Sequence, residues 1–312
     1  MEVKIGVVGT FIRDRIFPWQ GEEVESIGGI FFTVSYLANL LGEEDEIYPV
    51  CYVGEDFYEK LVGELSTYPN VRLEGLHVLP RKNTQVKLIY TGPQEREEVT
   101  TEPMPPLGYE ELYILNDVDA VEINLITGLD VDLATLKKFS QTTRALLYLD
   151  FHSHALGING TGKRYYRRPD DWLDWINLAH ILQLNEMEAR TLGGLPKETP
   201  KDELIEFGKE VLQYKPYVCH ITLAEEGSLL IYENEGQVKI KKIEALKINP
   251  VIDIIGCGDA FAAGFLVQYL QNGDIEAATH FANRIAGINC TFVGSTKIRQ
   301  IKSLLNSDKL QT

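Results

Sequence analysis

The sequence has few cysteines and no long apolar run. Its four cysteines are Cys51, Cys219, Cys257 and Cys290. They are far apart and form no C-x-x-C pair, which indicates free thiols of a reducing cytoplasm. No apolar stretch reaches the roughly 20 residues that a membrane-spanning helix needs, and the start of the chain shows no signal-peptide pattern. We therefore expect a cytoplasmic protein without a membrane partner.

Basic residues are also scarce relative to acidic ones. Lys and Arg total 30 against 46 Asp and Glu, so the net charge is −16 at pH 7. A surface of this sign repels phosphate backbones, which argues against nucleic acid as a partner. A single nucleotide can still bind, because one site can be locally positive and Mg²⁺ supplies charge.

Strand-like and helix-like segments alternate along much of the 312 residues. Strands are expected at 3–9, 47–53, 71–78, 84–90, 120–126, 145–150, 180–184 and 217–222, with a hairpin at 228–232 and 238–242. Helices are expected at 30–41, 57–65, 133–139, 186–192 and 202–212, followed by three helical stretches within 259–305. This alternation predicts crossover connections and a largely parallel sheet covered by helices on both faces, in one α/β domain over residues 1–312.

Two polar segments, 15–26 and 86–101, do not fit the alternation. Pattern alone favours surface loops. The alternative is a small β sheet that closes over an active site as a lid.

A glycine-rich turn leads directly into an apolar helix in the last quarter of the chain. Gly256, Cys257 and Gly258 are followed by Asp259 and then by a long run of apolar residues. The first turn of a helix leaves N–H groups without intrahelical partners, and the helix dipole also favours an anion there. Asp259 would lie beside this anion site, where it could take a proton from an attacking hydroxyl. The plainer interpretation is an ordinary helix start with an acid in its first turn.

The stretch 253–259 resembles the D-[ST]-x-G-x-G-D signature of the ribokinase/PfkB family, with Ile254 in place of the usual hydroxyl residue. The resemblance implies a ribokinase-like three-layer sandwich with a mainly parallel central sheet and a small β lid built from 15–26 and 86–101. It also implies that Gly256, Cys257 and Gly258 form an anion hole and that Asp259 is the catalytic base. Cys257 then serves only as a small residue in a tight turn.

A second match is Asn185-Glu-Met-Glu188, which resembles the N-x-x-E motif of the family. The resemblance implies that Asn185 and Glu188 position Mg²⁺, largely through water, and oxygen ligands suit this ion. The same spacing is that of a helix capping box. Both roles are compatible at the end of the predicted strand 180–184.

The N-terminal third carries the looser part of the resemblance. Gly28 and Gly29 look like the glycines that contact the acceptor in relatives, and Thr33 stands where relatives carry Asn. Asp14 follows the first strand, where relatives hold acceptor hydroxyls. The resemblance therefore implies that Asp14, Gly28, Gly29 and Thr33 bind the acceptor.

The nucleotide side is implied by two further matches. Residues 222–227 look like the T-x-G-x-x-G turn of the family, with Ala224 in place of a glycine, and Asn283 matches an Asn near the nucleotide. Thr222, Gly227 and Asn283 are therefore expected to bind ATP.

Four side chains near the acceptor side depart from the family pattern. Phe31 and Phe32 replace small residues, and His152 and His154 fall where many relatives carry D-P-N-x-R. The phenyl rings could belong to the core, or they could stack on a flat acceptor, in which case a purine nucleoside would compete with hexoses and ribose. The two histidines are interpreted as solvated rather than metal-binding.

Two other motifs are rejected. Residues 157–164 nearly match a P-loop, but Arg164 replaces the hydroxyl residue that Mg²⁺ requires. Residues 9–14 do not match the dinucleotide fingerprint G-x-G-x-x-G.

Taken together, the sequence predicts a kinase that transfers the γ-phosphate of ATP to a hydroxyl of a sugar or nucleoside with the help of Mg²⁺. The alternative is a catalytically silent binding protein on the same fold. The acceptor, activation by a monovalent cation and a homodimer formed through the lid are left open.

Overall fold

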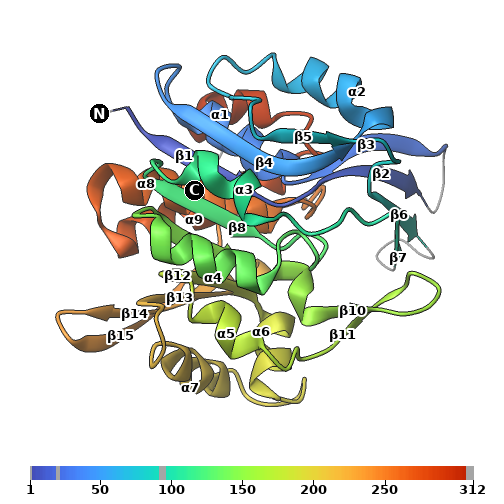
Figure 1. The fold of residues 1–312 in the computed structure, drawn as a ribbon. Helices are drawn as coiled ribbons and strands as arrows, with labels where there is room; N and C mark the ends of the chain where they lie inside the picture. Colours follow the sequence, from blue (N-terminus) through green and yellow to red (C-terminus); the bar gives the residue numbers. More distant parts are fainter. Residues whose placement is uncertain (1, 19–21, 91–95, 307–312) are drawn as a thin grey trace.

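The computed structural model describes residues 2–18, 22–90 and 96–306, and within them a nine-stranded sheet runs through the middle of the molecule (Figure 1). The strand order is β15-β14-β13-β12-β9-β8-β1-β4-β5. The seven strands from β13 to β5 are parallel, whereas β14 and β15 form an antiparallel hairpin at one edge. The bounds of these strands are β1 Lys4–Val8, β4 Glu46–Gly54, β5 Leu76–Leu79, β8 Ala120–Asn124, β9 Leu146–Asp150, β12 Ile181–Asn185, β13 Val218–Thr222, β14 Ser228–Asn234 and β15 Gln237–Ile243.

Helices cover both faces of this sheet, as the alternation predicts. One hydrophobic core lies between the sheet and α3–α7, and two others lie on the side of α1, α2, α8 and α9. The helix bounds are α1 Phe31–Leu40, α2 Glu55–Leu65, α3 Tyr109–Leu112, α4 Leu133–Thr142, α5 Trp172–Ile176, α6 Glu186–Gly193, α7 Asp202–Val211, α8 Cys257–Asn272, α9 Ile275–Asn289 and α10 Ile301–Leu305. The three-layer sandwich is thus confirmed.

A four-stranded second sheet, found within the described residues, forms the lid and projects beyond the edge of the sandwich (Figure 1). Its order is β3-β2-β6-β7, with β2 at Phe11–Phe17, β3 at Val24–Gly29, β6 at Gln85–Tyr90 and β7 at Arg96–Thr101. Only the β2–β6 pair is parallel. The preference for surface loops, which the pattern alone gave for 15–26 and 86–101, was therefore wrong.

The segment after β9 forms a hairpin that the sequence did not predict. Strands β10 Leu156–Ile158 and β11 Arg164–Tyr166 pair antiparallel, and the amide of Thr100 in the lid donates to the carbonyl of Gly162 at the hairpin turn. The near P-loop at 157–164 is this hairpin, so its rejection is confirmed.

The predicted strand at 71–78 was too long. Only β5 forms there, while Val71 makes an isolated bridge to Ile47. The short helices α3 and α5 were also missed.

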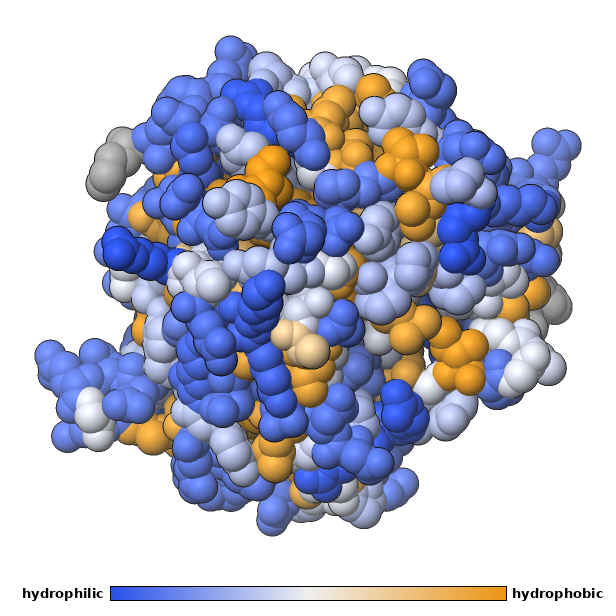
Figure 2. All heavy atoms as spheres, in the orientation of Figure 1, coloured by the Kyte–Doolittle hydropathy of each residue, from blue (hydrophilic) through white to orange (hydrophobic). Residues whose placement is uncertain are grey.

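The face of the molecule in Figure 2 is covered mostly by hydrophilic residues, with scattered apolar atoms between them. Among the described residues, no helix is long and apolar enough to cross a membrane.

Candidate active site

The helix α8 begins at the glycine-rich turn. Gly256 precedes the helix with φ +80°, a left-handed conformation that glycine adopts without a steric penalty. The chain then enters a 16-residue helix at Cys257, so the first-turn N–H groups of Gly258 and Asp259 point out of its N-terminus. The predicted anion hole is therefore a helix N-terminus preceded by a left-handed glycine.

Two side chains, one from β8 and one from α1, hold the carboxylate of Asp259. Its Oδ1 atom accepts a hydrogen bond from Nδ2 of Asn124 at 2.9 Å and from Oγ1 of Thr33 at 3.0 Å. Burial raises the pKa of Asp259 to about 6, although these two contacts act in the opposite direction. Asp259 is therefore ionised at neutral pH but retains appreciable basicity, as a general base requires.

A row of polar side chains crosses the sheet beneath this turn. Asn124 on β8, Asp150 on β9 and Gln183 on β12 are neighbours in register, and all three are buried. Nε2 of Gln183 donates to Oδ2 of Asp150 at 2.9 Å and to the carbonyl of Gly258 at 3.2 Å. This row connects the sheet directly to the start of α8.

Two carboxyl groups, that of Asp150 within the row and that of Glu188 beyond it, have no ion-pair partner in the described residues. Burial, with the charge of Asp259, raises the pKa of Asp150 to about 8. Burial, with the charge of Asp150, raises the pKa of Glu188 well above its ordinary value. The site thus has an excess of carboxyl oxygens, which a cation would stabilise in their ionised form.

Asn185 and Glu188 form the capping box of α6. The Oδ1 atom of Asn185 accepts from the amide of Glu188 at 2.9 Å, and Oε2 of Glu188 accepts from the amide of Asn185 at 2.8 Å. The capping role is confirmed. Within the described residues there is no cluster of three or more His, Cys, Asp or Glu that could hold a metal ion directly. A hydrated Mg²⁺ held through water fits this set of oxygen atoms better than direct coordination does.

The expected acceptor residues lie at the base of the lid, apart from Thr33. Gly28 pairs with Ile12, and a Cβ atom at Gly28 would lie 1.9 Å from Oδ2 of Asp14, so only glycine permits this close approach. Gly29 has φ +63°. Thr33, by contrast, is fully buried and directed at Asp259. The structure therefore brings Asp14, Gly28 and Gly29 together and places Thr33 behind the expected base.

Phe31 and Phe32 belong to the core. Their exposed fractions are 3% and 5%, and both lie in the cluster between α1 and α8. Of the two open interpretations, the structure supports core packing and not a stacking surface.

The two histidines differ from each other. His152 is exposed and has φ +36°, which is an unusual conformation for a residue with a side chain. His154 is only 9% exposed and packs against Phe151 and Trp175, so its interpretation as a solvated residue was wrong. It packs in an aromatic cluster beneath α5. The sequence did not predict α5, so this packing could not be anticipated.

The expected nucleotide residues lie at the carboxyl end of β13, before β14 and on α9. Thr222 pairs with Asn185 in register, and Gly227 turns the chain with φ +91°. Asn283 is buried, and its Nδ2 donates to Oγ of Ser228 and to the carbonyl of Ile243. That amide thus joins α9 to the β14–β15 hairpin.

The thiol of Cys257 faces α9. Its Sγ atom lies 3.3 Å from Sγ of Cys290, and both are free thiols. The backbone of Cys257 takes part in the turn, whereas its side chain packs against the neighbouring helix.

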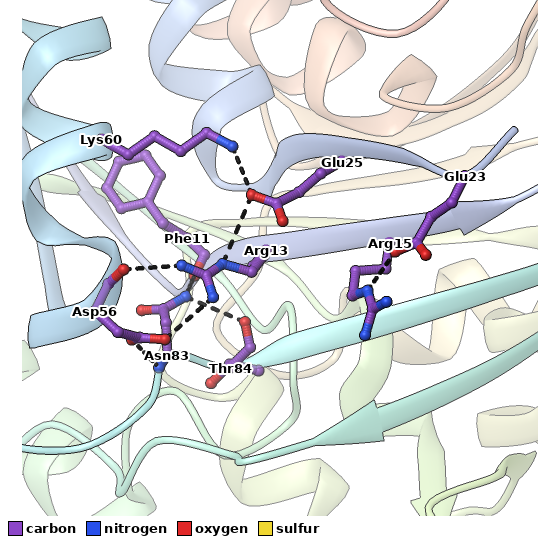
Figure 3. A network of polar contacts seen from close by, with 9 residues as sticks. All are labelled: Phe11, Arg13, Arg15, Glu23, Glu25, Asp56, Lys60, Asn83 and Thr84. Atoms are coloured by element: carbon purple, nitrogen blue, oxygen red, sulfur yellow. Dashed lines mark hydrogen bonds and ion pairs between the residues drawn. The ribbon is translucent and has the colours of Figure 1, made fainter.

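A polar network fixes the lid to the sandwich (Figure 3). Nη1 of Arg13 on β2 donates to Oδ2 of Asp56 on α2 at 3.1 Å, and Nη2 donates to the Asp56 carbonyl. Oδ1 of Asp56 accepts from the amide of Asn83, whose side chain donates to the carbonyl of Phe11. The first lid strand is therefore held at its base by side-chain contacts and not only by its peptide connections.

Sequence reasoning missed the side chains that support the turn. Glu122, Asn124, Asp150 and Gln183 all occupy strand positions that face α8. Strands of a parallel sheet buried on both faces are normally continuous apolar runs. A polar residue within each of these predicted apolar strands was therefore a signal that the sequence offered.

The chain is similar to known kinases along almost its whole length. The family model described as pfkB family carbohydrate kinase matches residues 7–301. Cytidine kinase of Thermococcus kodakarensis is 27% identical over 272 residues, covering 85% of this chain and 87% of that protein. Ribokinase of Arabidopsis thaliana, solved with ribose and ATP, superimposes with a TM-score of 0.76 at 18% identity over 99% of this chain and 100% of that one. A pyrophosphate-dependent kinase of the ribokinase family has a TM-score of 0.74 at 17% identity, covering 97% and 99%. The chain belongs to the pfkB family of carbohydrate kinases.

Proposed function

We propose that the protein transfers the γ-phosphate of ATP to a hydroxyl group of a nucleoside. The observation that carries the proposal is the position of Asp259 in the first turn of α8, beside a glycine turn and held by Asn124 and Thr33. Phosphoryl transfer needs an anion site and a correctly positioned proton acceptor more than it needs covalent chemistry by the protein. This arrangement provides both within one helical turn.

In the proposed reaction, Oδ2 of Asp259 removes the proton from the acceptor hydroxyl as that oxygen attacks the γ-phosphorus. The backbone N–H groups of Gly256 and Gly258 stabilise the charge that develops on the transferred phosphoryl group, whereas the N–H of Cys257 donates to the carbonyl of Ile254. Gln183 holds the turn in place through the carbonyl of Gly258.

Mg²⁺, when bound, would neutralise charge on the phosphate groups. Asn185 and Glu188 would hold its water shell. Thr222, Gly227 and Asn283 are proposed to lie on the nucleotide side, and Asp14, Gly28 and Gly29 on the acceptor side.

The nucleoside acceptor is proposed from the relatives and not from the aromatic rings. The cytidine kinase is similar over 85% of this chain and 87% of its own length. A free sugar is the second candidate, favoured by the structural likeness to a ribokinase. Pyrophosphate is the alternative donor, because a pyrophosphate-dependent kinase shares the fold.

The test is a two-way panel of donors and acceptors. Purified protein with Mg²⁺ is given ATP or pyrophosphate, together with cytidine, uridine, adenosine, ribose or fructose, and release of ADP or phosphate is measured. Acceptor-dependent ADP release with a nucleoside is the expected result. If only free sugars are phosphorylated, the acceptor proposal is wrong. If none of the acceptors in the panel leads to ADP release, the catalytically silent alternative gains support.

A further inference from the structure

An unusual acid lies directly behind Asp259. Glu122, on β8, is fully buried, and its Oε2 atom has no hydrogen-bond partner in the described part of the chain. The Oδ1 atom of Asn124, two residues further along the same strand, is also buried and without a partner there. Buried polar atoms are nearly always paired, so two unpaired acceptors on one face of one strand require a cause.

A proton on Oε2 of Glu122 would account for both unpaired atoms, because Oε2 could then donate it to Oδ1 of Asn124. An ionised carboxylate only accepts hydrogen bonds, whereas a protonated carboxyl group has one O–H donor. Burial, together with the charges of Asp259 and Asp150, raises the pKa of Glu122 well above its ordinary value, and the contacts with Thr33 and Asn124 do not offset this. This environment therefore favours the protonated, neutral form of Glu122.

The hydroxyl of Thr33 connects Glu122 to Asp259. Its Oγ1 atom lies 3.0 Å from Oδ1 of Asp259 and 3.3 Å from Oε1 of Glu122. A hydroxyl has one hydrogen and can donate it to only one of these carboxyl groups. If Glu122 were ionised, two carboxylates would compete for that hydrogen and repel each other. When Glu122 is neutral and its proton is donated to Oδ1 of Asn124, the remaining carbonyl oxygen Oε1 accepts more weakly than a carboxylate, so the Thr33 hydrogen is directed to the charged Asp259.

We propose that Glu122 is a positioning residue for Asp259. As a neutral acid, it orients the Thr33 hydroxyl and the Asn124 amide so that both donate to Oδ1 of Asp259. Oδ2 of Asp259 is then left for the proton of the acceptor hydroxyl. This inference rests on the proposed role of Asp259 as the base.

The other titratable groups around Glu122 and Asp259 are consistent with a neutral Glu122 and an ionised Asp259. Asp150 and Tyr148 face Glu122 from β9, and Tyr36 faces Asp259 from α1. Burial raises the pKa of both tyrosines, so they are neutral, and the pKa of Asp150 is about 8. Asp259, with a pKa of about 6, therefore ionises before Asp150 as the pH rises.

The test measures the pKa of Asp259 directly. Protein labelled with ¹³C at the Asp carboxyl carbon is titrated by NMR, and the Asp259 signal is assigned by its loss in Asp259→Asn. The variants are Glu122→Gln, Glu122→Leu and Thr33→Val. The control is Thr279→Val, which removes another fully buried threonine hydroxyl that contacts His220 and not the site.

The sign of the change distinguishes the possibilities. Loss of one hydrogen bond to the ionised Asp259 raises its pKa by about one unit, so we expect this rise in Glu122→Leu and Thr33→Val. Glutamine is also neutral and has an N–H donor, so Glu122→Gln should keep the wild-type value. If Glu122 were ionised instead, both Glu122 variants would lower the pKa of Asp259, and the proposal would be overturned. Unchanged values in every variant would overturn it as well.

Activity gives a second readout. From a pKa of about 6, a rise of one unit lowers the ionised fraction at pH 6 from one half to about one tenth. The loss of kcat/KM in Thr33→Val should therefore be about fivefold greater at pH 6 than at pH 8.5. A purely structural defect would lower kcat/KM equally at both pH values, and that outcome would contradict the proposal.

The two readouts separate this inference from the proposed function. The NMR titration needs no acceptor, so it can be interpreted even if the donor and acceptor panel fails. Should Glu122→Leu fail to fold, Thr33→Val and Glu122→Gln still decide the sign. Altered pKa values in a protein without kinase activity would refute the proposed function and leave the positioning of Asp259 intact.

Discussion

The ring of Phe32 lies against Gly256, so closely that a Cβ atom at Gly256 would be 2.5 Å from Cδ1 of Phe32. The contact joins α1, which follows the lid strand β3, to the turn that precedes α8. The glycine at 256 is thus required twice, for its positive φ and for its lack of a side chain. The aromatic residue that departs from the family pattern in the sequence therefore packs against the glycine-rich turn.

Gly256→Ala should therefore impair turnover strongly. Alanine in the left-handed region costs about 1–2 kcal/mol, and its methyl group must also displace the Phe32 ring. We expect turnover to fall by about 10², the effect of a displacement near 1 Å at the reacting atoms. Steady-state kinetics at saturating substrates measures this change.

Gly63→Ala is the matched control. Gly63 lies within α2, and a Cβ atom there would meet nothing within 4 Å. Alanine favours a helix by up to about 1 kcal/mol relative to glycine, so this variant should be slightly more stable and fully active. Equal activity in the two variants would show that the turn tolerates a side chain.

Asp259→Asn should remove the base and keep the fold. Asparagine has the same size and can still contact Thr33 and Asn124, so nucleotide affinity measured by calorimetry should change little. Turnover should fall by ~10²–10⁴, the usual contribution of a positioned base. Asp253→Asn is the control, because Asp253 caps loop amides of Ile255 and Gly294 and does not contact Asp259. Near-normal turnover in Asp259→Asn would rule out its role as base.

Activity should fall on the acidic side of neutrality. The pKa of Asp259 is raised from its ordinary value to about 6, and only the ionised form can accept a proton. The plot of kcat/KM against pH should therefore bend near pH 6 and decrease tenfold for each further pH unit. A bend near pH 4 would mean that burial does not perturb this carboxyl group in solution.

The sheet and the glycine-rich turn before α8 were predictable from sequence because both depend on local patterns. The alternation of strand-like and helix-like segments identified β8, β9, β12 and β13. The glycines around Cys257 identified the start of α8. These features need only a few neighbouring residues to be recognised.

The supporting polar row was not predicted, because its members meet only in the folded sheet. Asn124 and Gln183 are 59 positions apart in the sequence, and each looks like one polar residue in an apolar strand. Register brings both beside Asp150, and α8 then covers all three. Thr33 was assigned to the acceptor for a related reason: the direction in which a helical side chain points depends on how the helix packs.

Glu188→Gln should separate the capping role from the proposed metal role. Glutamine also completes a capping box, so the melting temperature should remain close to that of the parent. A neutral amide attracts a hydrated Mg²⁺ less than a carboxylate does, so turnover should be lower and the Mg²⁺ concentration for half-maximal rate should rise. Rates measured across a series of Mg²⁺ concentrations test this. An unchanged Mg²⁺ dependence would leave Glu188 with the cap alone.

Phe31→Ala and Phe32→Ala should destabilise the fold without changing the choice of acceptor. Both rings are buried in the core, and truncation of a buried phenylalanine typically costs 3–5 kcal/mol, so we expect a loss of about that size in urea unfolding. Phe139→Ala is the control, because Phe139 is fully buried in the core on the opposite face of the sheet. All three variants should show a similar loss of stability.

Kinetics then distinguishes the rings. Phe32→Ala should also lower turnover, since it removes the support beneath Gly256, whereas Phe139→Ala should not. The ratio of acceptor KM values for nucleoside and ribose should stay constant in every variant, because neither ring is exposed enough to stack on a base. A KM that rises for the nucleoside alone would instead mean that one ring contacts the base. In that case α1 would have to move when the acceptor binds.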